Sequence, residues 1–229
     1  MTGSSSNYPA GHASKGRIEV GRFLICYVTD RRGIGPESVE KRIFSAVEAG
    51  VDWVQIREKD LPTRTLLELT VSAASRARNT NTRIFVNDRL DVALAAGAHG
   101  VHLGGSSIPA KAVCSSVPPG MPVGVSCHSR EEAVRAESEG ARYVFFGPAF
   151  ETPSKLSYGP PLGLERLAEV AASVKIPVLA IGGITPRRVA DCLAHGAAGV
   201  AAIRMFQEDV SLEERIRELR EILPYGDVR

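Results

Sequence analysis

The sequence predicts a single α/β domain, a (β/α)8 or TIM barrel over residues 21–229, preceded by a flexible N-terminal tail of residues 1–20. Three observations support this prediction. A small-residue helix end followed by a glycine and an apolar run recurs four times, and four further apolar segments alternate with these repeats. Eight strand–helix pairs in about 205 residues suit a closed barrel. An open doubly wound sheet more commonly uses five or six strands, so we favour the barrel.

A glycine marks the end of a helix in each repeat. The repeats read EAGVDWVQI, AAGAHGVHL, SEGARYVFF and AHGAAGVAA, and their glycines are Gly50, Gly97, Gly140 and Gly196. A helix that turns into a strand needs a left-handed residue at its end, which glycine adopts without steric cost. Each repeat is therefore predicted to end one helix and to begin one strand.

The other strands and the helix starts follow from apolar runs and capping signals. The four strands between the repeats are predicted at residues 23–29, 83–87, 122–126 and 177–181. Helix starts are predicted at Pro36 with Glu37, at Pro62, at Pro109, at Ser129 with Glu131 and Glu132, and at Thr185 with Pro186. The strands are mostly apolar, as expected for parallel strands that are covered on both faces.

The last helix is predicted over residues 211–223. Its apolar residues share one face and are Leu212, Ile216, Leu219, Ile222 and Leu223. The charged residues of this helix are predicted to form an ordinary solvated surface with no functional role.

Composition excludes several functional classes. The chain has 28 Lys and Arg against 26 Asp and Glu, so its formal net charge of +2 gives no broad field for a nucleic acid or an anionic membrane. No segment approaches the roughly 18 apolar residues of a membrane-spanning helix, and the N-terminus lacks the apolar core of a secretory signal, so we expect a cytoplasmic protein. The scattered Cys26, Cys114, Cys127 and Cys192 are predicted to be buried, reduced thiols.

The loops after the seventh and eighth predicted strands carry the first candidate anion site. Gly182 and Gly183 lead directly into a helix start, where backbone N–H groups and the helix dipole favour an anion. Arg204, just past the eighth strand, adds a guanidinium to this site. Two glycines can equally make only a tight turn, and the arginine can equally be a surface ion-pair residue.

A second candidate anion site lies on the opposite side of the barrel mouth. Alternate residues of a strand face the same way, so Gln55 and Arg57 are predicted to point into the mouth together, with Lys59 just beyond. Asn87 ends the third strand, and Lys155 follows the sixth. Each of these residues alone would be unremarkable at a strand end, but their convergence predicts an anion-binding cluster.

Two further polar residues are candidates for chemistry. Asp88 directly follows the third strand and could bind Mg²⁺, which takes one or two carboxylates and completes its shell with substrate phosphate and water. Capping of the third helix is an equally open reading of Asp88, and Asp91 is assigned to the first turn of that helix. His128 could be a general acid or base, or a hydrogen-bonded residue at a strand end. His102 and Trp53 are assigned to strand packing.

Together these segments resemble the thiamine phosphate synthase and thiazole tautomerase family, whose members are (β/α)8 barrels. The resemblance covers residues 27–204. Its motifs are VQIREKD, VNDRLDVALAAGAHGVHLG, GVSCHS, FFGPAFETPSK, PVLAIGGIT and GVAAIR. Several motifs in one order are specific to this family, although they separate its two activities less well.

For a synthase, the resemblance implies that a hydroxymethylpyrimidine diphosphate is joined to a thiazole phosphate, with release of diphosphate. The residues implied around the pyrimidine diphosphate are Gln55, Arg57, Lys59, Asn87 and Lys155, with Asp88 on Mg²⁺, and Ser126 is implied to line the site as well. Those implied for the thiazole phosphate are Thr152, Ser154, Gly183 and the backbone of Arg204. The leaving diphosphate gains negative charge, which Mg²⁺, Arg and Lys stabilise increasingly as it develops. The predicted catalytic residues are Arg57, Lys59, Lys155 and His128.

One segment departs from the synthase pattern. After the fourth strand synthases typically carry Gly-Gln-Glu-Asp, in which the last acid is a second metal ligand, whereas this chain reads Gly104-Gly105-Ser106-Ser107. The missing carboxylate predicts a weaker affinity for Mg²⁺ before substrate binds.

Two alternatives stay open. A metal-independent thiazole tautomerase would use His128 to move a proton on a thiazole carboxylate phosphate, and that branch has a similar SxHSxEEA segment. The retained residues of the pyrimidine side favour the synthase over it. A non-catalytic protein that binds phosphate ligands and regulates related enzymes is the second alternative, and the sequence leaves a homo-oligomer open.

Overall fold

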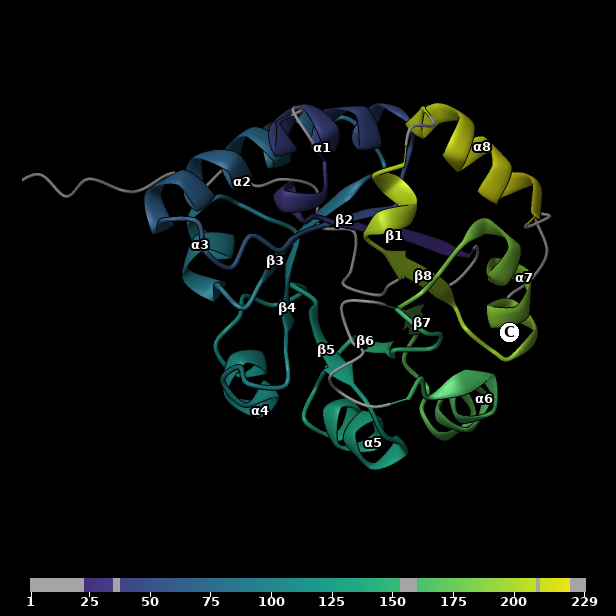
Figure 1. The fold of residues 1–229 in the computed structure, drawn as a ribbon. Coiled ribbons are helices and arrows are strands. Elements are labelled where there is room, and N and C mark those ends of the chain that lie inside the picture. Colours follow the sequence, from purple (N-terminus) through teal and green to yellow (C-terminus); the bar gives the residue numbers. More distant parts are fainter. Residues whose placement is uncertain (1–22, 35–37, 153–159, 209–210, 223–229) are drawn as a thin grey trace, which may run out of the picture.

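The computed structural model describes residues 23–34, 38–152, 160–208 and 211–222. Within these ranges parallel strands β1 to β8 close into a barrel in chain order, with β1 paired to β8 (Figure 1). Helices alternate with the strands and surround them. The predicted (β/α)8 architecture is therefore confirmed, while the predicted tail of residues 1–20 lies outside the described part of the chain.

The strands are short, and their bounds agree with the apolar runs. They are β1 (Leu24–Val28), β2 (Trp53–Ile56), β3 (Arg83–Asn87), β4 (Gly100–Leu103), β5 (Val123–Cys127), β6 (Tyr143–Phe146), β7 (Val178–Ile181) and β8 (Gly199–Ala202). β3 has the predicted bounds, and each end of β1, β5 and β7 lies within one residue of its prediction.

The helices begin largely where capping residues predict. They are α1 (Val39–Glu48), α2 (Thr63–Ala77), α3 (Leu90–Ala95), α4 (Ala110–Cys114), α5 (Arg130–Ser138), α6 (Gly163–Ser173), α7 (Pro186–Ala194) and α8 (Leu212–Ile222), with 3-10 helices η1 (Arg31–Gly33) and η3 (Arg204–Phe206). Pro62, Pro109, Ser129 and Thr185 are the N-cap residues of α2, α4, α5 and α7. Pro36 and Glu37 lie outside the described residues.

The four repeat glycines adopt the conformation that the sequence predicts. Their φ angles are 79° at Gly50, 65° at Gly97, 99° at Gly140 and 83° at Gly196. Each follows a helix and precedes a strand, so glycine avoids the steric cost of left-handed backbone at every one of these turns.

Large aromatic side chains fill the barrel interior. Trp53 packs against Phe85 and Tyr143, with ring centroids 4.9 Å and 4.7 Å away, which confirms its assignment to packing. Inward-facing glycines make room for these rings: a Cβ on Gly124 would lie 2.0 Å from the Tyr143 ring, and one on Gly100 would lie 2.6 Å from Phe85. The tightly packed interior closes the barrel below the mouth, so any ligand must bind at the loops above it.

The last helix corrects one sequence prediction. α8 buries the predicted apolar residues Leu212, Ile216 and Leu219, but its charged side chains do not all form a solvated surface. Arg215 is 7% exposed and pairs with two glutamates, and Arg220 donates to the buried carboxylate of Asp52 at 2.6 Å. A pattern of charges along one helix cannot reveal acidic partners supplied by other segments.

The cysteines are free thiols, and three of them are buried. The prediction of burial is wrong for Cys114, which is half-buried at the end of α4. Burial raises the pKa of the Cys127 thiol to about 12, so this cysteine is protonated at neutral pH.

Among the described residues, no helix is both long and apolar enough to cross a membrane.

Candidate functional site

A buried amide chain joins two neighbouring strands at the mouth of the barrel. The Gln55 side-chain N–H donates to Asn87 Oδ1 at 2.8 Å, and Asn87 Nδ2 donates to Asp88 Oδ2 at 2.7 Å. Gln55 is 2% exposed, and its carbonyl oxygen has no hydrogen-bond partner among the described residues. Because its nitrogen is used by Asn87, Gln55 offers this oxygen as an acceptor.

Asp88 has a backbone and a side chain that are both held in place. Its φ of 62° is left-handed, a conformation that Asp and Asn tolerate better than most residues. Its Oδ1 accepts from Gly104 N at 3.0 Å and from the hydroxyl of Ser107. The helix-cap reading of Asp88 is wrong, because Arg89 occupies the N-cap of α3. Asp91 is in the first turn of α3, as predicted.

The donor set around Asp88 fits one divalent cation with oxygen ligands. No group of three or more His, Cys, Asp or Glu residues could hold a metal ion within the described ranges. Asp88 Oδ1 accepts two hydrogen bonds, whereas Oδ2 accepts one, from Asn87. A carboxylate oxygen has about two lone-pair sites, so Oδ2 keeps one for a cation that takes its other ligands from substrate and water.

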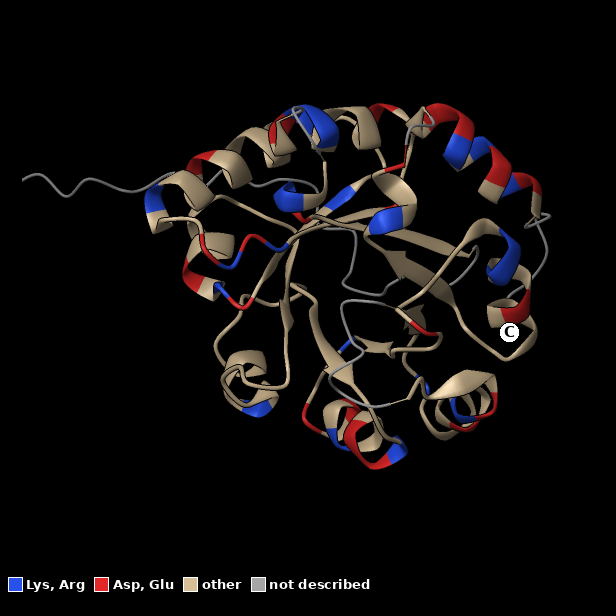
Figure 2. Cartoon of the chain, in the orientation of Figure 1, with Lys and Arg blue, Asp and Glu red and all other residues tan. Residues whose placement is uncertain are grey.

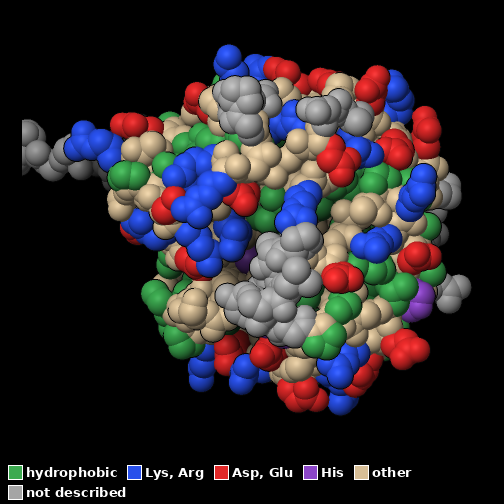
Figure 3. Space-filling view, viewed as in Figure 1, with side chains coloured by type: hydrophobic (Ala, Val, Ile, Leu, Met, Phe, Trp, Pro, Cys, Tyr) green, Lys and Arg blue, Asp and Glu red, His purple; other side chains and the backbone are tan. Residues whose placement is uncertain are grey.

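The loop after β2 presents positive charge at the mouth. Figure 2 shows that basic and acidic residues alternate along this loop, and its acids Glu58 and Asp60 both pair with Arg31 of η1. Arg57 is half-buried, Lys59 is exposed, and neither forms an ion pair with another described residue. Their charges are therefore available to a ligand, and Figure 3 shows Lys and Arg gathered over the loops that follow β2 and β3.

The first candidate anion site lies where β7 and β8 end side by side. Gly183 has a φ of 65°, and a Cβ there would lie 2.5 Å from the carbonyl oxygen of Glu151. Arg188 donates to Gly183 O at 2.7 Å and lies over the Phe150 ring. The tight turn therefore requires glycine whether or not an anion binds. The Gly183 carbonyl is fixed by Arg188, which lies on α7 outside the strands.

Other predicted site residues differ in how the structure places them. Arg204 is exposed and begins η3 directly after β8, beside the end of β7. Thr152 is half-buried on the loop after β6. Ser154 and Lys155 lie outside the described residues.

His128 is exposed at the end of β5 and makes two hydrogen bonds. Its Nδ1 lies 2.5 Å from Gly147 O, and its backbone N–H donates to Glu132 at 2.6 Å. A carbonyl can only accept, so Nδ1 carries the proton. These contacts match the strand-end reading of His128.

A buried polar chain below the mouth was missed by the sequence reasoning. His102, assigned only to packing, is 1% exposed and contacts Tyr143 Oη at 3.2 Å and Ser126 Oγ at 2.9 Å. One sequence signal could have revealed it. His102, Ser126 and Tyr143 occupy inward positions on adjacent strands, where polar atoms need partners.

Burial gives His102 a measurable effect on stability. Burial lowers the pKa of His102, Asp88 partly opposes this shift and Arg57 adds to it, so that the pKa falls to about 3. Between pH 6.5 and 3 the unfolded chain takes up a proton that the folded protein does not, so stability falls as pH decreases. His102→Gln is expected to flatten the dependence of unfolding free energy on pH in this window, as measured by urea denaturation.

The half-buried His195 provides a control for that change. It lies at the C-cap of α7. His195→Gln should leave the acid dependence as in the wild type. Equal pH slopes for the wild type and His102→Gln would contradict the buried neutral state of His102.

The chain is similar to a family model, to curated proteins and to a solved structure. The family model described as thiamine monophosphate synthase matches residues 25–206. A putative thiamine-phosphate synthase of Geobacter sulfurreducens is 43% identical over 202 residues, covering 88% of this chain and 95% of that protein. A thiamine-phosphate synthase of Roseiflexus castenholzii is 42% identical over 183 residues, 80% of each. The solved thiamine phosphate pyrophosphorylase from Pyrococcus furiosus has a TM-score of 0.79 and 35% identity, covering 89% of this chain and 96% of that chain.

Proposed function

Because this chain belongs to the thiamine monophosphate synthase family and is a thiamine-phosphate synthase, a transferase, we propose that its mouth binds the two substrates on opposite sides. The pyrimidine diphosphate lies over the ends of β2 and β3, and the thiazole phosphate lies over the ends of β7 and β8. Both are small phosphorylated molecules, which fits a chain with two local anion sites and little net charge.

The carbonyl oxygen of Gln55, which has no hydrogen-bond partner among the described residues, is the main support for placing the pyrimidine over β2 and β3. A buried acceptor without a partner is costly, and a ligand that donates a hydrogen bond removes that cost. The exocyclic amino group of an aminopyrimidine is such a donor. The bond from Gln55 to Asn87 fixes which way the amide faces, so the site selects a donor at this position.

Arg57 and Lys59 act on the diphosphate. In the reaction the bond between the pyrimidine methylene carbon and the diphosphate oxygen breaks, and its electron pair leaves with diphosphate. The aminopyrimidine ring delocalises the positive charge left on the methylene carbon, and the thiazole ring nitrogen then forms the new carbon–nitrogen bond. Negative charge grows on the leaving group, so fixed guanidinium and ammonium charges stabilise the transition state more than the ground state. We assign Lys155 to the same role from the sequence alone.

Asp88 is the residue that would hold Mg²⁺, with its Oδ2 facing the cation. When bound there, the ion would neutralise part of the diphosphate charge. Asn87 and Gly104 orient the carboxylate, and Ser107 contacts it where synthases typically carry a second acid.

The thiazole phosphate is assigned to the Gly183 side of the mouth. Its phosphate would accept from the backbone N–H groups of Gly183 and Arg204, and Thr152 and Ser154 would line the neighbouring loop. The Gly183 peptide is held by Arg188, so its backbone is set before the ligand arrives. Ser126 lines the pyrimidine side.

A direct assay tests the proposed function. Purified protein is incubated with hydroxymethylpyrimidine diphosphate, thiazole phosphate and Mg²⁺, and thiamine phosphate is expected by chromatography together with released diphosphate. Omission of either substrate is the control. Isomerisation of thiazole carboxylate phosphate without thiamine phosphate would indicate the tautomerase. Binding of thiazole phosphate without turnover of either kind would indicate the non-catalytic regulator.

His128→Ala separates the two enzymatic readings. A tautomerase needs a proton relay at this position, whereas the synthase reaction needs no protein base at His128. We therefore expect the variant to keep synthase turnover within about fivefold of wild type, a smaller change than the loss of a general acid or base causes. Complete loss of synthesis in a well-folded variant would show a catalytic role for His128.

Ser107→Asp tests the missing second acid. Ser107 contacts Asp88 directly, so the new carboxylate would lie beside an existing one. We expect tighter Mg²⁺ binding without substrate, measured by calorimetry, and a lower Tm in EDTA because two like charges then repel. Ser106→Asp on the exposed neighbouring residue is the control and should change neither value. Unchanged Mg²⁺ affinity of Ser107→Asp would contradict the assignment of Asp88 to the cation.

We also propose that the enzyme works in the cytoplasm. Phosphorylated substrates carry negative charge and do not cross a membrane unaided, so the enzyme is expected where they are made.

A further inference from the structure

A hydrogen-bonded chain of three side chains runs from the barrel interior to its mouth. Tyr143 on β6 contacts Nδ1 of His102 on β4 at 3.2 Å, and Nε2 of His102 contacts Ser126 Oγ on β5 at 2.9 Å. Tyr143 and His102 are each 1% exposed, whereas Ser126 is half-buried. Only Ser126 can therefore reach a ligand, and the other two residues can act only through it.

The hydrogen bonds that link Tyr143, His102 and Ser126 can run in one direction if every buried proton is to have an acceptor. The Tyr143 hydroxyl is deeply buried, and its hydrogen-bond partner among the described residues is His102 Nδ1. If Tyr143 donates to Nδ1, the imidazole proton lies on Nε2 and is donated to Ser126 Oγ. The reverse direction would leave the Tyr143 proton buried without an acceptor, which is costly. Burial also raises the pKa of Tyr143, so its hydroxyl stays protonated.

Packing prevents the chain from reorienting. The Tyr143 ring lies against Gly124, where a Cβ would come within 2.0 Å of it, and 5.4 Å from Phe85. The His102 ring lies over Phe145, with centroids 4.2 Å apart. Rings packed on these sides cannot flip without displacing the barrel interior, so each ring nitrogen of His102 keeps its partner.

We propose that Tyr143 and His102 are positioning residues that orient Ser126 as a hydrogen-bond donor to an acceptor atom of the pyrimidine diphosphate. Once Ser126 Oγ accepts from His102, its own proton is left to point into the mouth. An oxygen of the diphosphate or a ring nitrogen of the pyrimidine can accept it. This inference rests on the proposed function for the substrate, but the direction of the chain does not.

Tyr143→Phe keeps the ring and removes only the hydroxyl. We expect it to lower kcat/KM for pyrimidine diphosphate by about three- to tenfold, the range for one net hydrogen bond, while the KM for thiazole phosphate stays unchanged. Ser126→Ala should lower kcat/KM at least as much. His102→Gln, which keeps one donor and one acceptor, should retain more activity than His102→Leu.

The double variant distinguishes positioning from a general structural effect. If Tyr143 acts through Ser126, Tyr143→Phe in a Ser126→Ala background causes no further loss. Multiplicative losses would overturn the proposal. Thr82→Val removes another buried hydroxyl, which donates to Val51 O at the opposite end of the barrel, and should leave the kinetics unchanged.

A spectroscopic measurement tests the direction of the chain without any substrate. The ¹⁵N chemical shifts of His102 are expected to show the neutral tautomer with its proton on Nε2, and to lose this pattern in Tyr143→Phe. A proton on Nδ1 in the wild-type protein would overturn the inference. If no thiamine phosphate forms with the wild type but this tautomer is present, the proposed function fails and the built-in direction stands.

Discussion

Replacing Arg57 with alanine is expected to lower kcat/KM for thiamine phosphate formation by about 100- to 1000-fold, the effect of removing one preorganised donor to a developing negative charge. Arg57 is half-buried at the end of β2 and forms no ion pair within the described chain. We therefore expect its full charge to act on the leaving diphosphate. The loss should appear mainly in kcat, because that charge develops in the transition state. Steady-state kinetics with varied pyrimidine diphosphate measure it.

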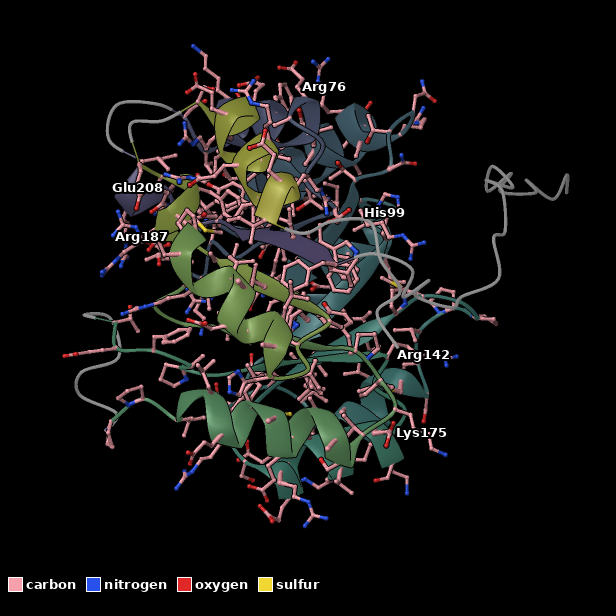
Figure 4. All side chains as sticks on the ribbon, turned by 90° about the vertical axis from the view of Figure 1, so that its right-hand side faces the viewer. Arg76, His99, Arg142, Lys175, Arg187 and Glu208 are labelled. Atoms are coloured by element: carbon pink, nitrogen blue, oxygen red, sulfur yellow. The ribbon has the colours of Figure 1, made fainter. Side chains whose placement is uncertain are left out.

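The fold should tolerate this change. The backbone N–H of Arg57 donates to Thr29 at 2.9 Å, and alanine keeps that bond. Arg142→Ala is the matched control, because Arg142 is exposed at the opposite end of the barrel, on the same side of the molecule as His99 and Lys175 (Figure 4). Arg142→Ala should have wild-type kinetics. Unchanged turnover in Arg57→Ala would remove Arg57 from the site.

Asp88→Asn is expected to reduce turnover by about 100-fold or more, because a neutral amide is a poor ligand for a cation that supplies several kcal/mol of charge stabilisation. The substitution keeps the side-chain shape, and Asn tolerates the left-handed φ of 62° at this position. Asp88→Ala would confound the loss of charge with backbone strain. Calorimetric titration of Mg²⁺ with inorganic diphosphate present, alongside turnover, measures the effect.

Asp91→Asn makes the same chemical change three residues away. Asp91 is exposed and pairs with Arg89 at the start of α3. This control should keep wild-type Mg²⁺ binding and turnover. If Asp88→Asn bound Mg²⁺ as tightly as the wild type, the cation would have to lie elsewhere.

Local sequence patterns predicted most of the fold because they report on short-range physics. The repeat glycines, the capping residue Ser129 and the Thr185–Pro186 pair act within one turn of helix, and the structure has them where they were predicted. The alternation of side chains along a strand likewise predicted that Gln55 lies inside, where it bonds to Asn87. The roles assigned to the site residues remain predictions.

Contacts between distant segments could not be predicted in the same way. Arg215 looked like a surface charge because one of its two partners, Glu208, lies before the helix. Arg220 looked like one because its partner Asp52 lies directly before β2, far away in the sequence. The contact between Ser107 and Asp88 depends on two loops that meet only when β3 and β4 pair.

Short-range sequence signals alone account for the eight-stranded barrel and for the polar residues that gather at its mouth. Only the closed barrel decided which of those residues touch and which direction their hydrogen bonds take. The reason is physical: capping and strand alternation are set by neighbours in the chain, whereas burial removes water and forces each polar atom to find a partner from another strand. The residues of its own strand assigned His102 to packing. Its polar partners Ser126 and Tyr143 belong to β5 and β6, and only the closed barrel brings them to it.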